Sequence, residues 1–405
     1  MERVMLPAAA WRERADLIEL CRVLGADTGT TRVVGGAVRD TLLAGAVSDI
    51  DLATRHAPED VLSLLQRARI KAVPTGLAHG TITAVLADGP VEVTTLRRDL
   101  TTDGRHAVVA FTDDWREDAA RRDFTINALY ADPITGELFD YFGGIDDLAV
   151  GRVRFIGDPL QRIAEDHLRI LRFFRFHARF GEVADADGLA ACTSRANDLM
   201  ALSRERIAAE LLKLLVAPGA VPTLTLMIAH GILLPVLPEI TQAGVTRLNE
   251  VAGYETAAAI APDPLRRLAA LLPRDPALGE AIANRLKLSN AQRKRIMSAL
   301  GEPGGTPPAL AYRLGRDGAL DRWLLTTTGS AAVTGAQAIA KFAIPTFPLT
   351  GGALVQRGVG KGPDVARMLR QVEDAWIAAG FPDAHRTAQL ADAAVDQWRR
   401  STSIA

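Results

Sequence analysis

The stretch Val33–Asp40 reads VVGGAVRD, and Asp49–Leu52 reads DIDL nine residues later. The first stretch predicts a short strand, a glycine turn and the start of a helix. Gly35 and Gly36 would let a phosphate approach the main chain, and the free amides of a first helical turn suit an anion. Arg39 adds a forked pair of donors one turn further on. A glycine pair before a helix also fits plain turn chemistry, so this stretch alone does not decide the function.

The second stretch places two carboxylates two residues apart. On a strand, Asp49 and Asp51 project from one face while Ile50 points into a core. Two neighbouring aspartates repel each other unless a cation lies between them, and Mg²⁺ prefers hard oxygen ligands of this kind. The pair therefore predicts a two-metal site in which Mg²⁺ serves an attacking hydroxyl and a triphosphate. The alternative is an exposed turn with two solvated aspartates.

A third acid follows on the predicted strand Val91–Thr94. Glu92 lies there between two valines that face the core. It either completes the catalytic carboxylates or orients Arg97 or Arg98, and the sequence leaves both open.

The pattern along the chain predicts an α+β protein. Strands and helices alternate up to about residue 150, which predicts a head with a small mixed or antiparallel sheet, and residues 96–117 read as a long connection. After that the chain is helical, beginning with one long helix over Pro159–Phe180. We predict a head (1–155), a neck (156–216), a body (217–330) and a tail (331–405).

Composition narrows the class of protein. The 405 residues carry a net charge of −1, so any contact with nucleic acid must come from local arginine clusters. Cys21 and Cys192 are the only cysteines, which favours the reducing cytoplasm and predicts no disulfide-linked partner. No apolar stretch reaches the roughly 18 residues that span a bilayer, so no membrane contact is expected.

With GGAVRD followed by DIDLAT, the sequence resembles the nucleotidyltransferase superfamily related to polymerase β. It is most similar to the branch of class II CCA-adding enzymes and bacterial poly(A) polymerases. The run Arg121–Leu129, RRDFTINAL, resembles a motif of this family that contacts the ribose and triphosphate of the incoming nucleotide. By this resemblance Arg122 pairs with a phosphate, while Asp123 and Asn127 bond ribose hydroxyls.

The segment from Arg162 to Phe176 is rich in arginine. Asp166 and Arg169 are three apart, so on a helix they can point together at a ligand. An aspartate acceptor beside an arginine donor complements the edge shared by cytosine and adenine, whose amino group lies next to a ring nitrogen. A plain salt bridge on a solvated face is the alternative.

The same segment resembles the family motif EDPLRxxRxxRF, with His167 in place of the usual proline. The resemblance implies that Asp166 and Arg169 select the base and that Arg172 and Arg175 support them. It also implies that the helix containing Arg206 braces this motif.

Taken together, the resemblance predicts template-independent addition of CCA to the 3′ end of tRNA from CTP and ATP. A poly(A) polymerase or an enzyme that adds only A shares these motifs, and a catalytically silent RNA-binding protein is a further alternative. The glycine-rich turn around Lys361 is a candidate contact for an RNA phosphate.

Overall fold

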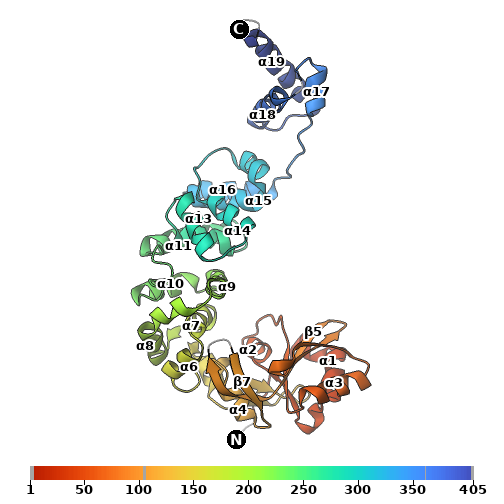
Figure 1. Ribbon diagram of the computed structural model, residues 1–405, viewed down its shortest axis with the longest axis vertical. Helices are drawn as coiled ribbons and strands as arrows, with labels where there is room; N and C mark the ends of the chain where they lie inside the picture. The colour runs from red at the N-terminus through yellow and green to blue at the C-terminus, as the bar shows by residue number, and fades with distance from the viewer. Residues whose placement is uncertain (1–3, 104–105, 361, 403–405) are drawn as a thin grey trace. The chain divides into compact units, whose positions relative to one another are not determined.

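The computed structural model describes residues 4–103, 106–360 and 362–402 (Figure 1). The chain divides into two compact units. Unit 1 comprises residues 1–245 and 285–288, and unit 2 comprises residues 246–284 and 289–405. Lys361 lies outside the described residues.

The head of unit 1 is built on a seven-stranded mixed sheet in the order β3-β4-β5-β2-β1-β8-β9. Only β2 and β5 run parallel; every other neighbouring pair is antiparallel. The strands are β1 (Thr31–Val34), β2 (Asp51–Thr54), β3 (Lys71–Gly76), β4 (Thr81–Leu86), β5 (Gly89–Thr95), β8 (Leu129–Ala131) and β9 (Leu138–Asp140). The mixed sheet predicted for the head is therefore confirmed.

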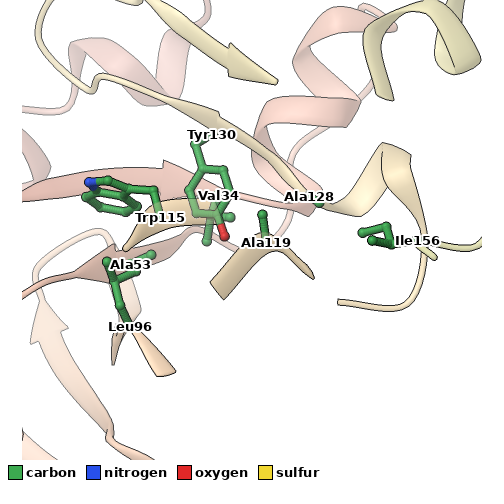
Figure 2. Close-up of a cluster of buried hydrophobic side chains, with 8 residues drawn as sticks. All are labelled: Val34, Ala53, Leu96, Trp115, Ala119, Ala128, Tyr130 and Ile156. Carbon is green, nitrogen blue, oxygen red and sulfur yellow. The ribbon is translucent and has the colours of Figure 1, made fainter. Parts of the chain in front are cut away.

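Helices and the sheet of the head enclose a buried apolar cluster (Figure 2). Its members come from the central strands, from α4 and from the chain around the sheet: Val34, Ala53, Leu96, Trp115, Ala119, Ala128, Tyr130 and Ile156. The head helices are α1 (Ala15–Val23), α2 (Gly36–Leu42), α3 (Pro58–Arg67), α4 (Trp115–Ala120) and α5 (Gly144–Ala149). Burial of this cluster holds α4 against β8.

The expectation that residues 96–117 form only a long connection is wrong. Most of it forms an antiparallel hairpin of β6 (Arg97–Asp103) and β7 (His106–Phe111), a two-stranded sheet of its own. The run Ala107–Phe111 is apolar and partly β-branched, which suits a strand. The pairing register of the hairpin shifts between Asp99 and Thr101, however, and this shift interrupts the alternation of side chains.

The single long helix expected over Pro159–Phe180 is also wrong. The chain forms α6 (Pro159–Glu165) and α7 (Leu168–Phe180), and Asp166 between them is extended, with φ −152° and ψ 106°. Its side chain accepts a hydrogen bond from the amide of Leu168 (3.1 Å). Aspartate competes in this way with helical hydrogen bonding, and the competition ends one helix and begins the next.

Four aromatic rings join the head to the neck within unit 1. Phe124 lies 4.9 Å from Phe155 and 5.3 Å from Phe176, and Phe155 stacks on Phe173 at 5.6 Å. All four side chains are buried. The turn after Arg122 and helix α7 therefore share one apolar core.

The remaining elements of unit 1 are short strands and helices: β10 (Arg152–Val153), β11 (Val183–Ala184), α8 (Ala186–Ser194), α9 (Arg204–Leu215) and α10 (Ala220–Ala229). Short 3₁₀ turns cover Ala10–Glu13, Ala26–Thr28, Leu77–His79, Thr125–Asn127 and Ala196–Ala201. The predicted change from an α/β head to a helical remainder is confirmed.

All the regular secondary structure described in unit 2 is helical. Its helices are α11 (Gln242–Ala257, which starts in unit 1), α12 (Pro264–Leu271), α13 (Pro276–Arg285), α14 (Asn290–Ala299), α15 (Pro307–Thr326), α16 (Gly329–Lys341), α17 (Gly351–Gln356), α18 (Pro363–Ala378) and α19 (Ala384–Thr402). None of the helices described is both long and apolar enough to cross a bilayer.

A closed ion network lies in the interior of unit 2. Arg266 donates to Glu255 (2.7 Å) and to Asp321 (3.0 Å), and all three side chains are at most 2% exposed. Arg295 reaches Asp321 from the outer side (2.5 Å) and also pairs with Asp263. Every charge in this network has a partner of opposite sign.

Candidate active site

One pocket of unit 1, with a volume of about 570 Å³, brings most of the predicted site residues together. Six arginines and three aspartates line it, besides two glycines, an asparagine and a phenylalanine: Gly35, Gly36, Arg39, Asp51, Arg97, Arg121, Arg122, Asp123, Asn127, Asp166, Arg169, Arg172 and Phe176. This excess of positive charge suits an anion such as a nucleoside triphosphate. A larger cavity of unit 2, about 700 Å³, contains none of the predicted site residues.

The glycine turn forms one wall of the pocket. Gly35 has φ +74° and ψ −121°, a conformation that L side chains rarely adopt. A Cβ atom there would lie 3.5 Å from the carbonyl oxygen of Asn127 and 3.7 Å from Nη1 of Arg122. Glycine therefore lets the main chain of β1 turn into α2 directly beside Arg122.

The carboxylates meet at the parallel pair of strands. Asp51, the first residue of β2, is in register with Glu92 on β5, so the two side chains lie on the same face of the sheet. Burial raises the pKa of Asp51, the nearby charges of Glu92 and Asp49 add to the rise, and Arg122 opposes it. This carboxyl thus lies in a position with surplus negative charge.

Asp49 and Glu92 lie beside the pocket, not among its lining residues. Asp49 precedes the first paired residue of β2, is exposed, and accepts a hydrogen bond from the hydroxyl of Ser48 (2.8 Å). Among the described residues, no three His, Cys, Asp or Glu side chains are arranged as a ready-made metal cluster. The ligand role of Glu92 stays a prediction.

Arg39 is more engaged than its sequence position indicates. Its guanidinium donates to Asp40 (2.8 Å) and to Oδ1 of Asn127 (2.5 Å), and its central carbon lies 4.2 Å from the ring centroid of Phe180. Only 6% of the residue is exposed. Arg39 therefore orients Asn127 as well as contributing positive charge to the pocket.

Asp123 links the head to α7. It accepts hydrogen bonds from the side-chain amide of Asn127 (3.0 Å) and from Nε of Arg172 (2.8 Å). Burial would raise the pKa of Asp123, but the attraction of Arg172 and these hydrogen bonds lower it. The carboxylate is thus ionised and fixed in orientation beside Asn127.

The two residues predicted to read the base both line the pocket, but they do not pair with each other. Nη2 of Arg206, on α9, binds both oxygens of Asp166 at 2.8 and 3.1 Å. Nη1 of Arg169 donates to the carbonyl of Arg162 (2.8 Å) and to Glu165. The alternative of a simple salt bridge between Asp166 and Arg169 is therefore wrong.

Of the two supporting arginines, only Arg172 reaches the pocket. Arg175 donates to Glu210 of α9 (2.5 Å), and its guanidinium carbon lies 4.2 Å from the ring centroid of Phe176. It supports the pocket from behind, through Phe176.

Sequence reasoning missed a set of groups beneath Arg121 and Arg122. The side chain of Arg162 donates to the carbonyl oxygens of both residues, at 2.5 and 2.7 Å. Asp118, which is 1% exposed, binds the side chains of both. Its spacing of three and four residues from these arginines on the end of a helix was the available signal.

Two family profiles match this chain. A sequence profile described as the poly A polymerase head domain matches residues 31–154. A second profile, described as the probable RNA and SrmB-binding site of polymerase A, matches residues 185–243.

Individual relatives match most of the chain. The mitochondrial CCA tRNA nucleotidyltransferase 1 of Danio rerio is 35% identical over 379 residues, which cover 89% of this chain and 86% of that protein. The Homo sapiens protein of the same name is 34% identical, over 86% of this chain and 83% of that protein. The crystal structure of the Bacillus stearothermophilus CCA-adding enzyme in complex with CTP superposes with a TM-score of 0.73 at 25% identity, covering 96% of this chain and all of the other.

Proposed function

The chain belongs to the CCA tRNA nucleotidyltransferase family, and from this premise we propose that it adds CTP, CTP and ATP in turn to the 3′ end of tRNA, releasing pyrophosphate at each step. The observation that carries this proposal is the single pocket that holds a glycine turn, Asp51, Arg122 and the Asp166/Arg169 pair. Hydrogen-bond donors for phosphate, a carboxylate and polar side chains that can contact a base thus line one cavity.

The donor set fits Mg²⁺. Asp49 and Asp51 are hard oxygen ligands, and the surplus negative charge that raises the pKa of Asp51 is the kind that a cation relieves. Phosphate oxygens and water would complete the coordination. When bound, Mg²⁺ supplies Lewis-acid stabilisation of the charge on the triphosphate and lowers the pKa of the attacking hydroxyl.

We assign one part of the nucleotide to each wall of the pocket, and the side chains that line each wall support this assignment. The triphosphate lies at Gly35–Gly36 and Arg122, where main-chain amides and a guanidinium neutralise its charge. The ribose hydroxyls lie beside Asp123 and Asn127. With the nucleotide held in this way, the 3′-hydroxyl of the RNA attacks the α-phosphate and pyrophosphate leaves. No protein side chain forms a covalent intermediate.

Base choice belongs to Asp166 and Arg169. A carboxylate acceptor beside a guanidinium donor matches the amino group and ring nitrogen of both cytosine and adenine. Both side chains have protein partners, namely Arg206 for Asp166 and Glu165 for Arg169. Binding of the base therefore exchanges existing hydrogen bonds, and these bonds hold both side chains in orientation before the nucleotide enters.

We assign the remaining parts by the predicted division of the chain. The head (1–155) performs the transfer and the neck (156–216) selects the base. The body (217–330) and the tail (331–405) hold the tRNA, with the turn around Lys361 as a phosphate contact. The reducing cytoplasm, expected from the cysteine content, is the proposed location.

One experiment tests the activity. A tRNA transcript that lacks its terminal CCA is incubated with the protein, Mg²⁺ and CTP, then with ATP, and the 3′ end is sequenced. We expect two C residues from CTP alone and a single A after ATP is added. Addition of A without C would indicate an enzyme that adds only A or a poly(A) polymerase, and binding without extension would indicate a silent RNA-binding protein.

A further inference from the structure

Asp118 is a buried carboxylate of α4 that the reaction described above does not use. It accepts four hydrogen bonds, from the hydroxyl of Tyr130 (2.6 Å), Nε of Arg121 (2.8 Å), Nη2 of Arg122 (3.1 Å) and the main-chain amide of Arg97 (3.3 Å). Burial would raise its pKa, but the attraction of Arg122 and Arg121 outweighs burial and lowers the pKa to about 2. Asp118 is therefore a fixed negative charge at neutral pH.

The donors on Asp118 lead directly to the pocket. Arg97, Arg121 and Arg122 all line it. Tyr130 donates to Asp118 and accepts from Nε of Arg122 (3.2 Å), which closes a triangle of three side chains. Tyr130 is also in register with Val34, the residue before the glycine turn, so the triangle is attached to the strand that forms the wall of the pocket.

This arrangement leaves one edge of Arg122 directed at the glycine turn. Nε and Nη2 are bound to Tyr130 and Asp118, while Nη1 lies near Gly35 and is paired with none of the described residues. Guanidinium groups gathered in one pocket repel one another, and a long arginine side chain has many rotamers. A buried carboxylate that binds two of them offsets the repulsion and restricts their rotamers before a ligand arrives.

We propose that Asp118 is a positioning residue for the triphosphate: it does not touch the nucleotide, but it holds Arg122 in the orientation that binds phosphate at the glycine turn. This inference rests on the proposed function, in which Arg122 contacts the triphosphate. Tyr130 has a smaller part in the same task because it holds only Nε of Arg122.

The competing explanation is that Asp118 only stabilises the packing of α4. Asp147 on α5 provides a matched control for this role. It is fully buried and also accepts from a hydroxyl, that of Thr125 (2.6 Å), and from two arginines, Arg152 (2.7 Å) and Arg154 (2.9 Å). Neither of these arginines lines the pocket.

The test is a double-mutant cycle in which nucleotide binding is measured by calorimetry with Mg²⁺ present and tRNA absent. The dissociation constants of CTP and of CMP are measured for the wild type, Asp118→Asn, Arg122→Met, the double variant and Asp147→Asn. We expect Asp118→Asn to weaken CTP binding about tenfold, because one charge-assisted hydrogen bond between Arg122 and the triphosphate is lost. CMP binding should change little. In the Arg122→Met background the same change should have no further effect.

Asp147→Asn is expected to lower the melting temperature while leaving the ratio of CTP to CMP affinity as in the wild type. Tyr130→Phe keeps the carboxylate and replaces Asp118→Asn if the latter does not fold; it should weaken CTP severalfold. Additive losses in the double variant, or an unchanged ratio in Asp118→Asn and Tyr130→Phe, would overturn the positioning role. If instead the wild type bound CTP no more tightly than CMP, the triphosphate site of the proposed function would itself fail.

Discussion

Two arginine–carboxylate networks, one in each unit, have the same chemistry but different surroundings. In unit 2, Arg266 has a carboxylate on either side, Glu255 and Asp321, and the three side chains are at most 2% exposed. In unit 1, the arginines bound to Asp118 and Asp123 extend from their carboxylates into a pocket of about 570 Å³. The first network is closed on itself, whereas the second presents donors and acceptors to a ligand.

The difference shows that the number of ion pairs says little about function. What matters is whether each charged group is used up by its protein partners. Arg266 uses two nitrogens on two carboxylates, while Arg122 keeps Nη1 beside a glycine turn. A closed network should thus affect stability alone, and an open one should affect binding and catalysis. Four measurements test this contrast.

The largest effect is expected at the two carboxylates that we propose as Mg²⁺ ligands. Asp51→Asn or Asp49→Asn should reduce nucleotide transfer to tRNA by at least about 10³-fold, ~4 kcal/mol of transition-state stabilisation, because one negative ligand is lost. Gel shifts should show tRNA binding close to that of the wild type. Asp146→Asn, an exposed change on α5, is the control and should retain full activity. Transfer at the wild-type rate by Asp51→Asn would contradict the two-metal assignment.

Breaking the closed network should affect stability. Asp321→Ala leaves Arg266 buried with one partner fewer, which should lower the free energy of unfolding of unit 2 by about 3 kcal/mol. Chemical denaturation measures this loss, and calorimetry measures CTP binding by the folded protein. Weakened CTP binding together with an unchanged stability would reverse the contrast between the two networks.

Asp118 combines features of both networks, and its stabilisation should depend on pH. Its pKa falls from 3.8 to about 2 in the folded chain, so its charge stabilises the fold fully above about pH 4, by about 2 kcal/mol, and this contribution is lost as the pH falls to about 2. The difference in unfolding free energy between wild type and Asp118→Asn should therefore shrink over this range. Urea titrations at pH 6 and pH 3 measure it; a constant difference would exclude an ionised Asp118.

The smallest effect concerns base choice. Asp166→Ala removes the acceptor for the amino group, so the preference for CTP over UTP should fall about tenfold, roughly one hydrogen bond. Competition between CTP and UTP during single-nucleotide addition measures it. Asp187→Ala, exposed on α8, serves as the control. An unchanged preference would place base selection elsewhere in the neck.

The sequence predicted the class of fold and most of the residues that line the pocket. Strand β5 begins two residues before and ends one residue after the predicted strand Val91–Thr94, because apolar alternation is a local signal. Gly35, Asp51, Arg122 and Asp166 were each identified from short motifs, and all line one cavity.

What the sequence did not reveal depends on contacts between distant segments. The break at Asp166 arises from its own side chain and from Arg206, 40 residues away, neither of which alters the helical pattern. The hairpin β6–β7 is paired with itself and not with the main sheet, so its alternation is weak. Arg39 contacts Asn127 and Phe180, and these two partners likewise become visible only once the chain has folded.

The aromatic core of Phe124, Phe155, Phe173 and Phe176 has a consequence for how one site accepts two nucleotides of different size. The turn after Arg122 and helix α7, to which we assign the triphosphate and the base, are rooted in the same close-packed rings, with neighbouring centroids 4.9 to 5.6 Å apart. Because such a core resists deformation, the span between these two walls is fixed. The change from the smaller cytosine to the larger adenine must then be absorbed by the side chains of Asp166 and Arg169 and by their exchangeable partners.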